Sequence, residues 1–254
     1  MPDAYERWLV PTLFQPFAED LTRRAVRRAP SRILELAAGT GVLTRQLTAA
    51  LPGAAVTATD LNDAMVELGS ARAPGATWRQ ADATALPFED GSFDLVVCQF
   101  GVMFFPDKPT AYAEARRVLA AGGAFVFNTW GRVDEHAFAD ALVDATAALF
   151  PDGAPLFLTS IPHGYSEVAA VEADLRAGGL TCAAPETITL EGHAETADDV
   201  ARGFCLGTPL RGEIEARGDL DELTAAVGAA MTARLGRGAV TGRMTAHVFE
   251  AVLS

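Results

Sequence analysis

The sequence has 254 residues but only three cysteines and a single lysine, Lys108. The cysteines, Cys98, Cys182 and Cys205, lie far apart and form no Cys-x-x-Cys pair, so the spacing of a zinc site is absent. An odd number of scattered cysteines is typical of a reducing compartment and gives no disulfide framework. The net charge of −13 produces a field that repels polyanions, so nucleic acid is not an expected partner.

Long apolar runs are also missing. The longest, residues 95–105, is interrupted by Gln99 and reaches about half of the ~20 residues that a membrane-spanning helix needs. The first residues are acidic and lack the basic-then-apolar pattern of a secretory leader. A hydrophobic content of 50% with 21% charged residues indicates a packed globular chain, which we expect to be cytoplasmic.

One local exception to the acidic charge is a group of arginines, Arg23, Arg24, Arg27, Arg28 and Arg32. Their spacing is that of a helix. It predicts a solvated helix face rather than a patch that binds nucleic acid.

The first half of the chain alternates apolar runs with helix-like stretches. Continuous apolar strands that alternate with helices predict a parallel sheet covered on both faces. Asn62 is expected to cap one helix, and Asp107 or Thr110 the next. The predicted strands are 33–37, 55–59, 77–80, 93–100 and 124–129, and the predicted helices are 43–51, 62–72 and 108–119.

The second half is less regular and predicts a helical stretch near 137–149, another at 165–177, and a strand pair formed by 182–190 and 245–253. Segments 131–165 and 196–240 follow the fifth and sixth main strands and are long enough to form a lid over a pocket.

We therefore predict one α/β domain over residues 1–254. It has a Rossmann-like, seven-stranded, mostly parallel sheet with helices on both faces, and a mainly helical lid from those insertions. The predicted core is about 30–130 and 165–254, with an N-terminal helix at 1–29.

The segment with the clearest chemistry runs from Glu35 to Gly41, directly after a predicted strand and before a helix. Gly39 and Gly41 permit a tight turn and a close approach of the backbone to a ligand, and the N–H groups at the helix start face the same crevice. Asp60 ends the next strand, where a carboxylate can accept hydrogen bonds from ribose hydroxyls. A buried carboxylate at Glu35 suits a ligand that carries an ammonium and a sulfonium better than one that carries a pyrophosphate.

This segment, with three others, resembles class I S-adenosylmethionine (SAM)-dependent methyltransferases, in particular the group similar to the ubiquinone/menaquinone-biosynthesis enzymes (methyltransferase type 11). The similar stretches are ILELAAGTGVLT (33–44), VTATDLN (56–62), QADATALPFEDGSFDLVVCQFGVMFFPD (80–107) and ARRVLAAGGAFVFNTW (115–130). The resemblance covers roughly residues 30–130. It implies SAM as the cofactor, S-adenosylhomocysteine as the product, and no metal.

The resemblance also implies a role for each matching residue. Glu35, Ala37, Gly39 and Gly41 match the motif that lies against the methionine part of SAM. Asp60 matches the residue that binds the ribose hydroxyls, and Leu61 the residue beside the adenine. Asp82 and the Ala83 N–H match the contacts to the adenine amino group and ring, and Gln99 and Phe100 the contacts to the amino acid end. Ala38 replaces the Cys or Gly that the family has before the first motif glycine.

The acceptor side is less defined. Direct displacement from a sulfonium needs alignment and exclusion of water, and a general base only when the acceptor must lose a proton. His163, a loop histidine expected at the surface, is the candidate base. Tyr5 and Phe14 in the N-terminal helix, and Met103 and Phe104 after the fourth strand, are candidates for the pocket, with core packing as the alternative. We expect a small, uncharged or cationic, partly hydrophobic acceptor and leave a homodimer open.

Three other interpretations were weighed. An amino-methylating nucleic-acid enzyme would have an Asn/Asp-Pro-Pro-Tyr segment where this chain has 98–102, and an NAD-dependent dehydrogenase would have glycine at Thr44. A SAM-binding regulatory or scaffold protein without turnover is compatible with an intact cofactor motif.

Overall fold

The computed structural model describes residues 2–253 and divides into two compact units. We call them the sheet unit and the helical unit. Among the described residues, the sheet unit comprises 17–130, 165–188 and 246–253, and the helical unit comprises 2–16, 131–164 and 189–245. The candidate cofactor residues all fall in the sheet unit. The prediction of one domain over the whole chain stays a prediction.

The sheet has the strand order β3-β2-β1-β4-β5-β8-β6, with β7 paired to β8. The pairs β3/β2, β2/β1, β1/β4 and β4/β5 are parallel, whereas β8 is antiparallel to β5 and to β6. The strands are β1 (Arg32–Glu35), β2 (Ala55–Asp60), β3 (Thr77–Gln80), β4 (Phe93–Gln99), β5 (Leu119–Trp130), β6 (Leu180–Cys182), β7 (Glu186–Ala194) and β8 (Val240–Leu253). The predicted mostly parallel, Rossmann-like sheet is confirmed.

The strand count differs from the prediction, because the described residues form an eight-stranded sheet rather than a seven-stranded one. Residues 182–190 were predicted as one strand, but the chain ends β6 at Cys182 and starts β7 at Glu186. Pro185 lies in the break, and its missing N–H cannot donate to a strand ladder. The predicted pairing of this region with the last strand is confirmed.

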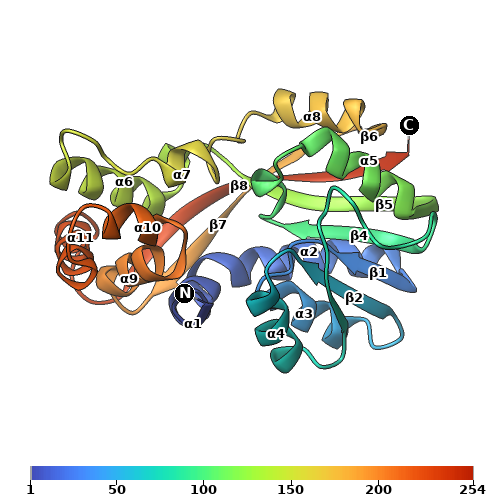
Figure 1. The fold of residues 1–254 in the computed structure, drawn as a ribbon, viewed down its shortest axis with the longest axis horizontal. Helices are drawn as coiled ribbons and strands as arrows, with labels where there is room; N and C mark the ends of the chain where they lie inside the picture. Colours follow the sequence, from blue (N-terminus) through green and yellow to red (C-terminus); the bar gives the residue numbers. More distant parts are fainter. Residues whose placement is uncertain (1, 254) are drawn as a thin grey trace. The chain divides into compact units, whose positions relative to one another are not determined.

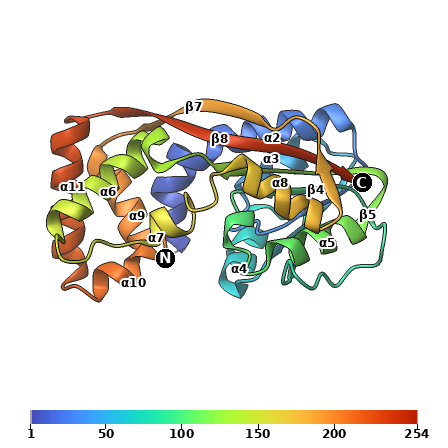
Figure 2. The same cartoon turned by 90° about the horizontal axis from the view of Figure 1, so that it is seen from above.

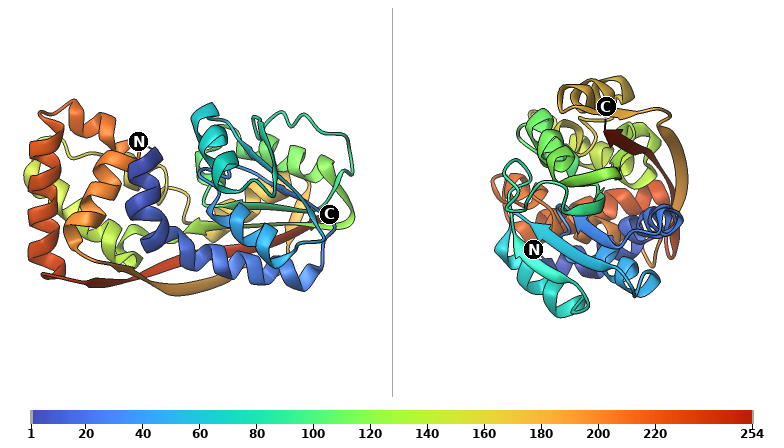
Figure 3. Two further views of the ribbon diagram at one scale, coloured as in Figure 1. Left: turned by 90° about the horizontal axis from the view of Figure 1, so that it is seen from below. Right: turned by 90° about the vertical axis from the view of Figure 1, so that its right-hand side faces the viewer.

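Helices cover both faces of the sheet within the sheet unit. Figures 1 and 2 show α5 (Lys108–Val118) and α8 (Val168–Ala177) on one face. Figure 3 shows α2 (Gln15–Arg28) and α3 (Val42–Ala50) on the opposite face, where α4 (Asp63–Arg72) packs near β2 and β3. The central strands are therefore buried on both sides, as their continuous apolar sequence requires.

The helix starts agree with the sequence. The Asn62 side chain accepts from the Ala64 backbone N–H at 2.9 Å and caps α4. The Asp107 side chain accepts from the Thr110 N–H at 3.0 Å and caps α5. Each cap satisfies a backbone donor that has no partner inside the helix, a contribution of about 1 kcal/mol.

The core of the sheet unit is aromatic as well as aliphatic. Phe125, Phe127 and Phe249 are fully buried on the paired strands β5 and β8. The rings of Phe127 and Phe249 stack with centroids 4.9 Å apart, and Tyr112 from α5 packs on Phe127 at 5.6 Å. Complete burial of such rings contributes roughly 1.5–3 kcal/mol each, which holds α5 against the sheet.

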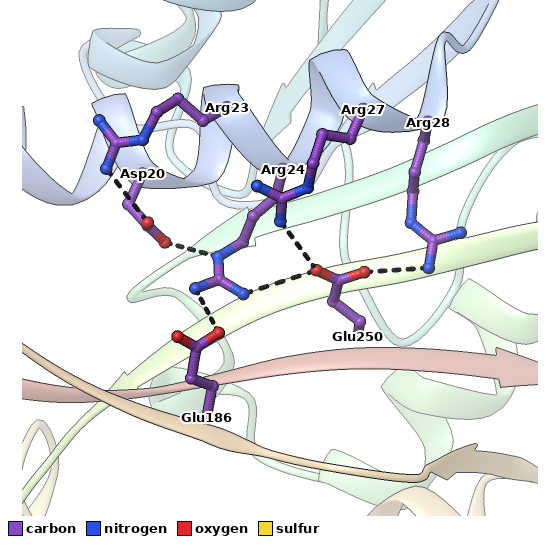
Figure 4. Close-up of polar contacts among 7 residues, drawn as sticks. All are labelled: Asp20, Arg23, Arg24, Arg27, Arg28, Glu186 and Glu250. Atoms are coloured by element: carbon purple, nitrogen blue, oxygen red, sulfur yellow. Dashed lines mark hydrogen bonds and ion pairs between the residues drawn. The ribbon is translucent and has the colours of Figure 1, made fainter.

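The arginine group on α2 is only partly the solvated face that was predicted. Arg23 and Arg27 are exposed, but Arg24 is only 7% exposed. Figure 4 shows the Arg24 guanidinium between Asp20 of α2, Glu186 of β7 and Glu250 of β8. The prediction fails at this residue because the strands beside the helix bring acidic partners that the helix pattern does not reveal.

The helical unit is built from η1 (Tyr5–Phe14), α6 (Ala137–Leu149), α7 (Phe157–Ser160), α9 (Ala197–Gly207), α10 (Leu210–Glu215) and α11 (Leu220–Leu235). Helix α9 packs against η1 and α11, and α11 also packs against α6. Gly203 permits the close approach of η1, because a Cβ there would lie 2.6 Å from Leu9 Cδ2. The predicted mainly helical character of the two insertions matches this unit, and their role as a lid stays a prediction.

The predicted N-terminal helix is present, with α1 (Pro2–Ala4) before η1 and α2 after it, but its middle is wound as a π-helix. Pro11 lies inside that stretch and removes one amide donor from the helical ladder. Within residues 2–253, no helix is long and apolar enough to cross a membrane.

Candidate functional site

The loop between β1 and α3 has the backbone of a ligand-binding turn. Gly39 and Gly41 adopt φ values of +57° and +84°, and Ala37 adopts +51°. These are left-handed conformations that glycine reaches at no steric cost and alanine only with strain. Gly41 directly precedes the first residue of α3, so the loop leads into the N–H groups at the helix start.

Asp60, at the end of β2, braces this loop. Its Oδ2 accepts from the Gly39 N–H at 2.8 Å, and its Oδ1 accepts from the Asn62 N–H at 2.9 Å. Burial raises the pKa of the Asp60 carboxyl, and the backbone N–H groups of Asn62, Gly39 and Leu61 oppose that rise. The parallel pairing of β1 and β2 places Asp60 at the same sheet edge as the glycine loop.

Glu35, the last residue of β1, is buried with an exposed fraction of 1%. The Thr44 hydroxyl of α3 donates to its Oε2 at 2.6 Å. Burial, reinforced by the charge of Asp60, raises the pKa of Glu35 to about 8, although Thr44 and Arg45 act in the opposite direction. Two carboxyl groups therefore lie beside the glycine loop, where a cationic ligand would favour their ionised forms.

The residues that the resemblance assigns to the adenine, Leu61, Asp82 and Ala83, lie at and after the ends of β2 and β3. Leu61 is 64% exposed, and its carbonyl oxygen accepts from the Gln80 side chain at 3.0 Å. Asp82 is exposed and accepts from the Thr84 N–H and hydroxyl, which lower the pKa of its carboxyl. The Ala81 N–H donates to the Asp60 carbonyl oxygen at 3.0 Å and ties the two strand ends together. Ala83, half-buried, follows in the same loop.

At the end of β4, Gln99 is followed by a strained turn. Phe100 has φ +50°, and its N–H donates to the Asn128 Oδ1 at 2.8 Å. The Phe100 ring stacks on Trp130, with centroids 3.6 Å apart, and meets the edge of Phe17. The Phe100 ring is thus buried in an aromatic cluster. A ligand at this turn would therefore contact the backbone of 99–100 rather than the ring. The sequence analysis did not identify Asn128 as the residue that holds this turn. The signal that could have revealed it is a single amide side chain within the apolar run of β5.

Comparison with known proteins adds a sequence relationship to this geometry. Residues 34–127 match the family model described as a methyltransferase domain. A demethylmenaquinone methyltransferase from Thermus thermophilus is 43% identical over 106 residues, which cover 40% of this chain and 48% of that protein. Residues 34–127 are thus similar in sequence to a methyltransferase domain.

The sequence similarity is limited in extent. The chain spans less than half the length of the curated relatives it matches. The fold likeness reaches further. YcgJ from Bacillus subtilis is 20% identical with a TM-score of 0.59, covering 93% of this chain and 97% of that one. The phosphoethanolamine N-methyltransferase 2 of Haemonchus contortus, solved with SAM, is 17% identical with a TM-score of 0.59, covering 99% and 56%.

Two acceptor-side candidates lie within the matched residues 34–127. Met103 is buried, and its Sδ lies 3.4 Å from the Trp130 backbone nitrogen, so this side chain is part of the core. Phe104, its neighbour, is 47% exposed. Of the pair, only Phe104 offers an apolar surface without rearrangement.

The remaining candidates, Tyr5, Phe14 and His163, lie in the helical unit. Tyr5 and Phe14 face one another, with ring centroids 4.9 Å apart. His163 was expected at the surface, but it is only 7% exposed, because its Nδ1 lies 2.8 Å from the Gly131 carbonyl oxygen and its ring packs on His136.

His136, a weaker candidate for the base in the sequence, is a buried partner of His163. Its Nδ1 accepts from the Ala139 N–H at the start of α6, and the two imidazole rings meet edge to face at 5.5 Å. Burial, with a contribution from His163, lowers the pKa of His136 to about 3, and burial also lowers that of His163. Both rings are neutral at pH 7. No group of three or more His, Cys, Asp or Glu side chains in the described chain is arranged to hold a metal ion.

Proposed function

We propose that this protein transfers a methyl group from SAM to a small, partly hydrophobic organic acceptor by direct displacement, with S-adenosylhomocysteine as the product. The observation that supports this most is the braced loop after β1. Gly39 and Asp60 are joined by a hydrogen bond at the carboxyl ends of β1 and β2, where Glu35 also lies and where open α/β sheets bind their ligands.

The residues at this edge suit SAM in charge and shape. Burial and the charge of Asp60 both disfavour the ionised form of Glu35, and a ligand with an ammonium and a sulfonium would stabilise that form. The exposed Leu61 side chain gives a flat apolar contact for an adenine, and the Asp82 carboxylate and Ala83 N–H complete the adenine contacts. Gln99 and Phe100 would face the amino acid end through their backbone.

In this mechanism SAM supplies an activated methyl group on a good leaving group. The glycine loop and Asp60 would hold the cofactor, and the hydrogen bond between Asp60 and Gly39 would keep that loop in one conformation. Rate enhancement then comes from alignment with the acceptor and exclusion of water. His163 is neutral at pH 7, as a general base must be, and would act only for an acceptor that loses a proton.

The acceptor is proposed by class alone. The relative from Thermus is named for demethylmenaquinone and the neighbour from Haemonchus for phosphoethanolamine, so similar domains serve different acceptors. Segments 131–165 and 196–240 are apolar and acidic, which favours an uncharged or cationic acceptor over an anionic one. We propose these segments as the lid, and a homodimer remains an untested possibility for partners.

Titration calorimetry with SAM and with NAD tests the proposal. Wild-type protein is expected to bind SAM saturably and NAD not at all. Asp60→Asn should weaken SAM binding at least tenfold. The substitution changes the carboxylate that would accept hydrogen bonds from the ribose hydroxyls, and it also changes the hydrogen bond that holds Gly39. Asp94→Asn is the matched control. Asp94 lies at the start of β4, at the opposite sheet edge, where it accepts from the Ser31 and Arg32 N–H groups.

Folded wild-type protein that binds no SAM would contradict the proposal, as would equal loss of affinity in both variants. Turnover to S-adenosylhomocysteine with a panel of neutral, cationic and anionic acceptors then separates an enzyme from a SAM-binding protein without turnover. Methylation confined to strongly anionic acceptors would contradict the acceptor class.

A further inference from the structure

The interior of the candidate site contains a buried titratable carboxyl, that of Glu35, whose protonation state the binding proposal does not address. Glu35 is fully buried at the end of β1, and the Thr44 hydroxyl is its direct donor at 2.6 Å. Thr44 is itself completely buried, so this hydrogen bond is shielded from water. The residue stands where a dinucleotide-binding loop would have its third glycine, a position that could not supply a hydroxyl.

The groups that face Glu35 come from three elements. Asp60 on β2 adds a like charge, Arg45 on α3 adds an opposite charge, and the thiol of Cys98 on β4 is close enough for Glu35 to raise its pKa. Burial outweighs the favourable contributions of Thr44 and Arg45, so the pKa of Glu35 stands near 8 without ligand. The carboxyl is then mostly protonated at pH 7.

We propose that Thr44 is a positioning residue that holds Glu35 ready to ionise, so that binding of the cationic cofactor is coupled to release of one proton from Glu35. This inference rests on the proposed function, because SAM is the ligand that supplies the positive charge. The step is balanced: the Glu35 carboxyl loses its proton to the buffer, and the carboxylate that remains pairs with the ammonium end of SAM.

The coupling has a quantitative signature in calorimetry. Binding enthalpies measured in buffers of different ionisation enthalpy give the number of protons released. Because the pKa of Glu35 lies near 8, this carboxyl should contribute the release of about 0.9 proton per SAM at pH 7, about 0.5 at pH 8 and about 0.1 at pH 9. Ionisation of Glu35 should by itself lower the dissociation constant for SAM roughly tenfold from pH 6 to pH 7, with little further decrease above pH 8.

Variants separate Glu35 from the ligand's own amine, which also titrates in this range. Glu35→Gln reports only the ligand's contribution, so the difference between wild type and this variant belongs to Glu35. Thr44→Val keeps the shape of the side chain but removes the donor. It should move the midpoint of proton release about one pH unit upward and weaken SAM binding at pH 7 roughly tenfold. Thr44→Ser keeps the hydroxyl and should restore the wild-type profile.

A wild type whose proton release equals that of Glu35→Gln would overturn the coupling while SAM binding, and the proposed function, still stand. Identical midpoints for Thr44→Val and wild type would overturn the role of Thr44. Absence of SAM binding by folded protein would remove the proposed function first. Carbon-13 NMR of the glutamate carboxyls in wild-type protein, with and without SAM, gives the same answer without any substitution: one carboxyl should titrate near pH 8 and ionise when SAM is added.

Discussion

Gly39 and Gly41 have similar backbone conformations but different neighbours. A Cβ at Gly39 would meet nothing within 4 Å, whereas a Cβ at Gly41 would lie 3.0 Å from Cζ2 of the Trp78 side chain. Both positions also have a left-handed φ that disfavours any other residue. Gly39 therefore has a conformational reason to be glycine, and Gly41 has a steric reason in addition.

We expect Gly39→Ala to lower the free energy of unfolding by about 1–2 kcal/mol, the strain of a left-handed alanine. Gly41→Ala should cost more, because Trp78 must also shift. Urea denaturation of both variants checks the order. Gly53→Ala, where a Cβ meets nothing within 4 Å and φ is not left-handed, is the control and should stay near wild type. An equal loss in the two loop variants would contradict the role given to Trp78.

Glu35 also predicts how stability depends on pH in the absence of cofactor. Its pKa is raised from 4.5 to about 8 in the folded state, so the folded protein binds more protons than the unfolded chain between those values. Stability from this group is complete below about pH 4.5 and is lost as pH rises toward 8, at about 1.4 kcal/mol per pH unit. Glutamine resembles protonated glutamic acid in shape but does not ionise, so Glu35→Gln should not lose this stability as the pH rises.

The measurement is chemical denaturation from pH 5 to pH 8 for wild type and Glu35→Gln. The stability difference should grow in favour of the variant as pH rises. Parallel pH curves for the two proteins would show that Glu35 ionises in the folded state as readily as in the unfolded chain.

At the scale of elements, Arg24 joins one helix to two strands. It lies 2.6 Å from Asp20, 2.8 Å from Glu186 and 3.5 Å from Glu250, while Arg28 reaches Glu250 from the same helix at 3.0 Å (Figure 4). The guanidinium is buried, but Glu186 is 59% exposed, so water screens part of the interaction. The network fixes α2 against β7 and β8 through a central cation.

We expect Arg24→Met to lower the free energy of unfolding by about 1–3 kcal/mol, because three carboxylates lose their shared partner. Arg23→Met is the matched control. Arg23 is 60% exposed and contacts Asp20 alone, so its loss should cost less than about 0.5 kcal/mol. Thermal unfolding of the two variants distinguishes them, and equal shifts would argue against the network.

The elements of the sheet unit were largely predictable because their sequence signals are local. Apolar runs ended by Gly or Asp gave β1, β2 and β4, and the Asn62 and Asp107 caps fixed two helix starts. Pro185 is a sequence signal for the break between β6 and β7, but the apolar residues on both sides of it favoured a single strand.

Features set by distant contacts were not predictable. His163 was expected at the surface because it lies in a loop, yet the Gly131 carbonyl and His136 bury it. Arg24 was assigned to a solvated face from its helical spacing, but its partner Glu186 lies 162 residues away. In both cases the deciding group comes from another part of the chain, which periodicity cannot report.

At the scale of the whole molecule, the charge of −13 predicts the class of partner. We expect no binding of duplex or single-stranded oligonucleotides at 0.15 M salt, because the mean field repels phosphate and the arginines of α2 are largely paired with carboxylates. Fluorescence anisotropy with labelled oligonucleotides checks this. Binding that weakens steeply with salt would show a cationic surface that the ion pairs do not neutralise.

The position of β8 has a consequence for synthesis of the protein. β8 is the last strand along the sequence, yet it lies inside the sheet, between β5 and β6. Until β8 has been synthesised, the strand edge of β5 that it covers stays unpaired, and β6 lacks the strand that it pairs with. The nascent chain therefore carries an open, strongly apolar strand edge while the residues between β5 and β8 are made, a period in which chaperone binding would protect it from pairing with another chain.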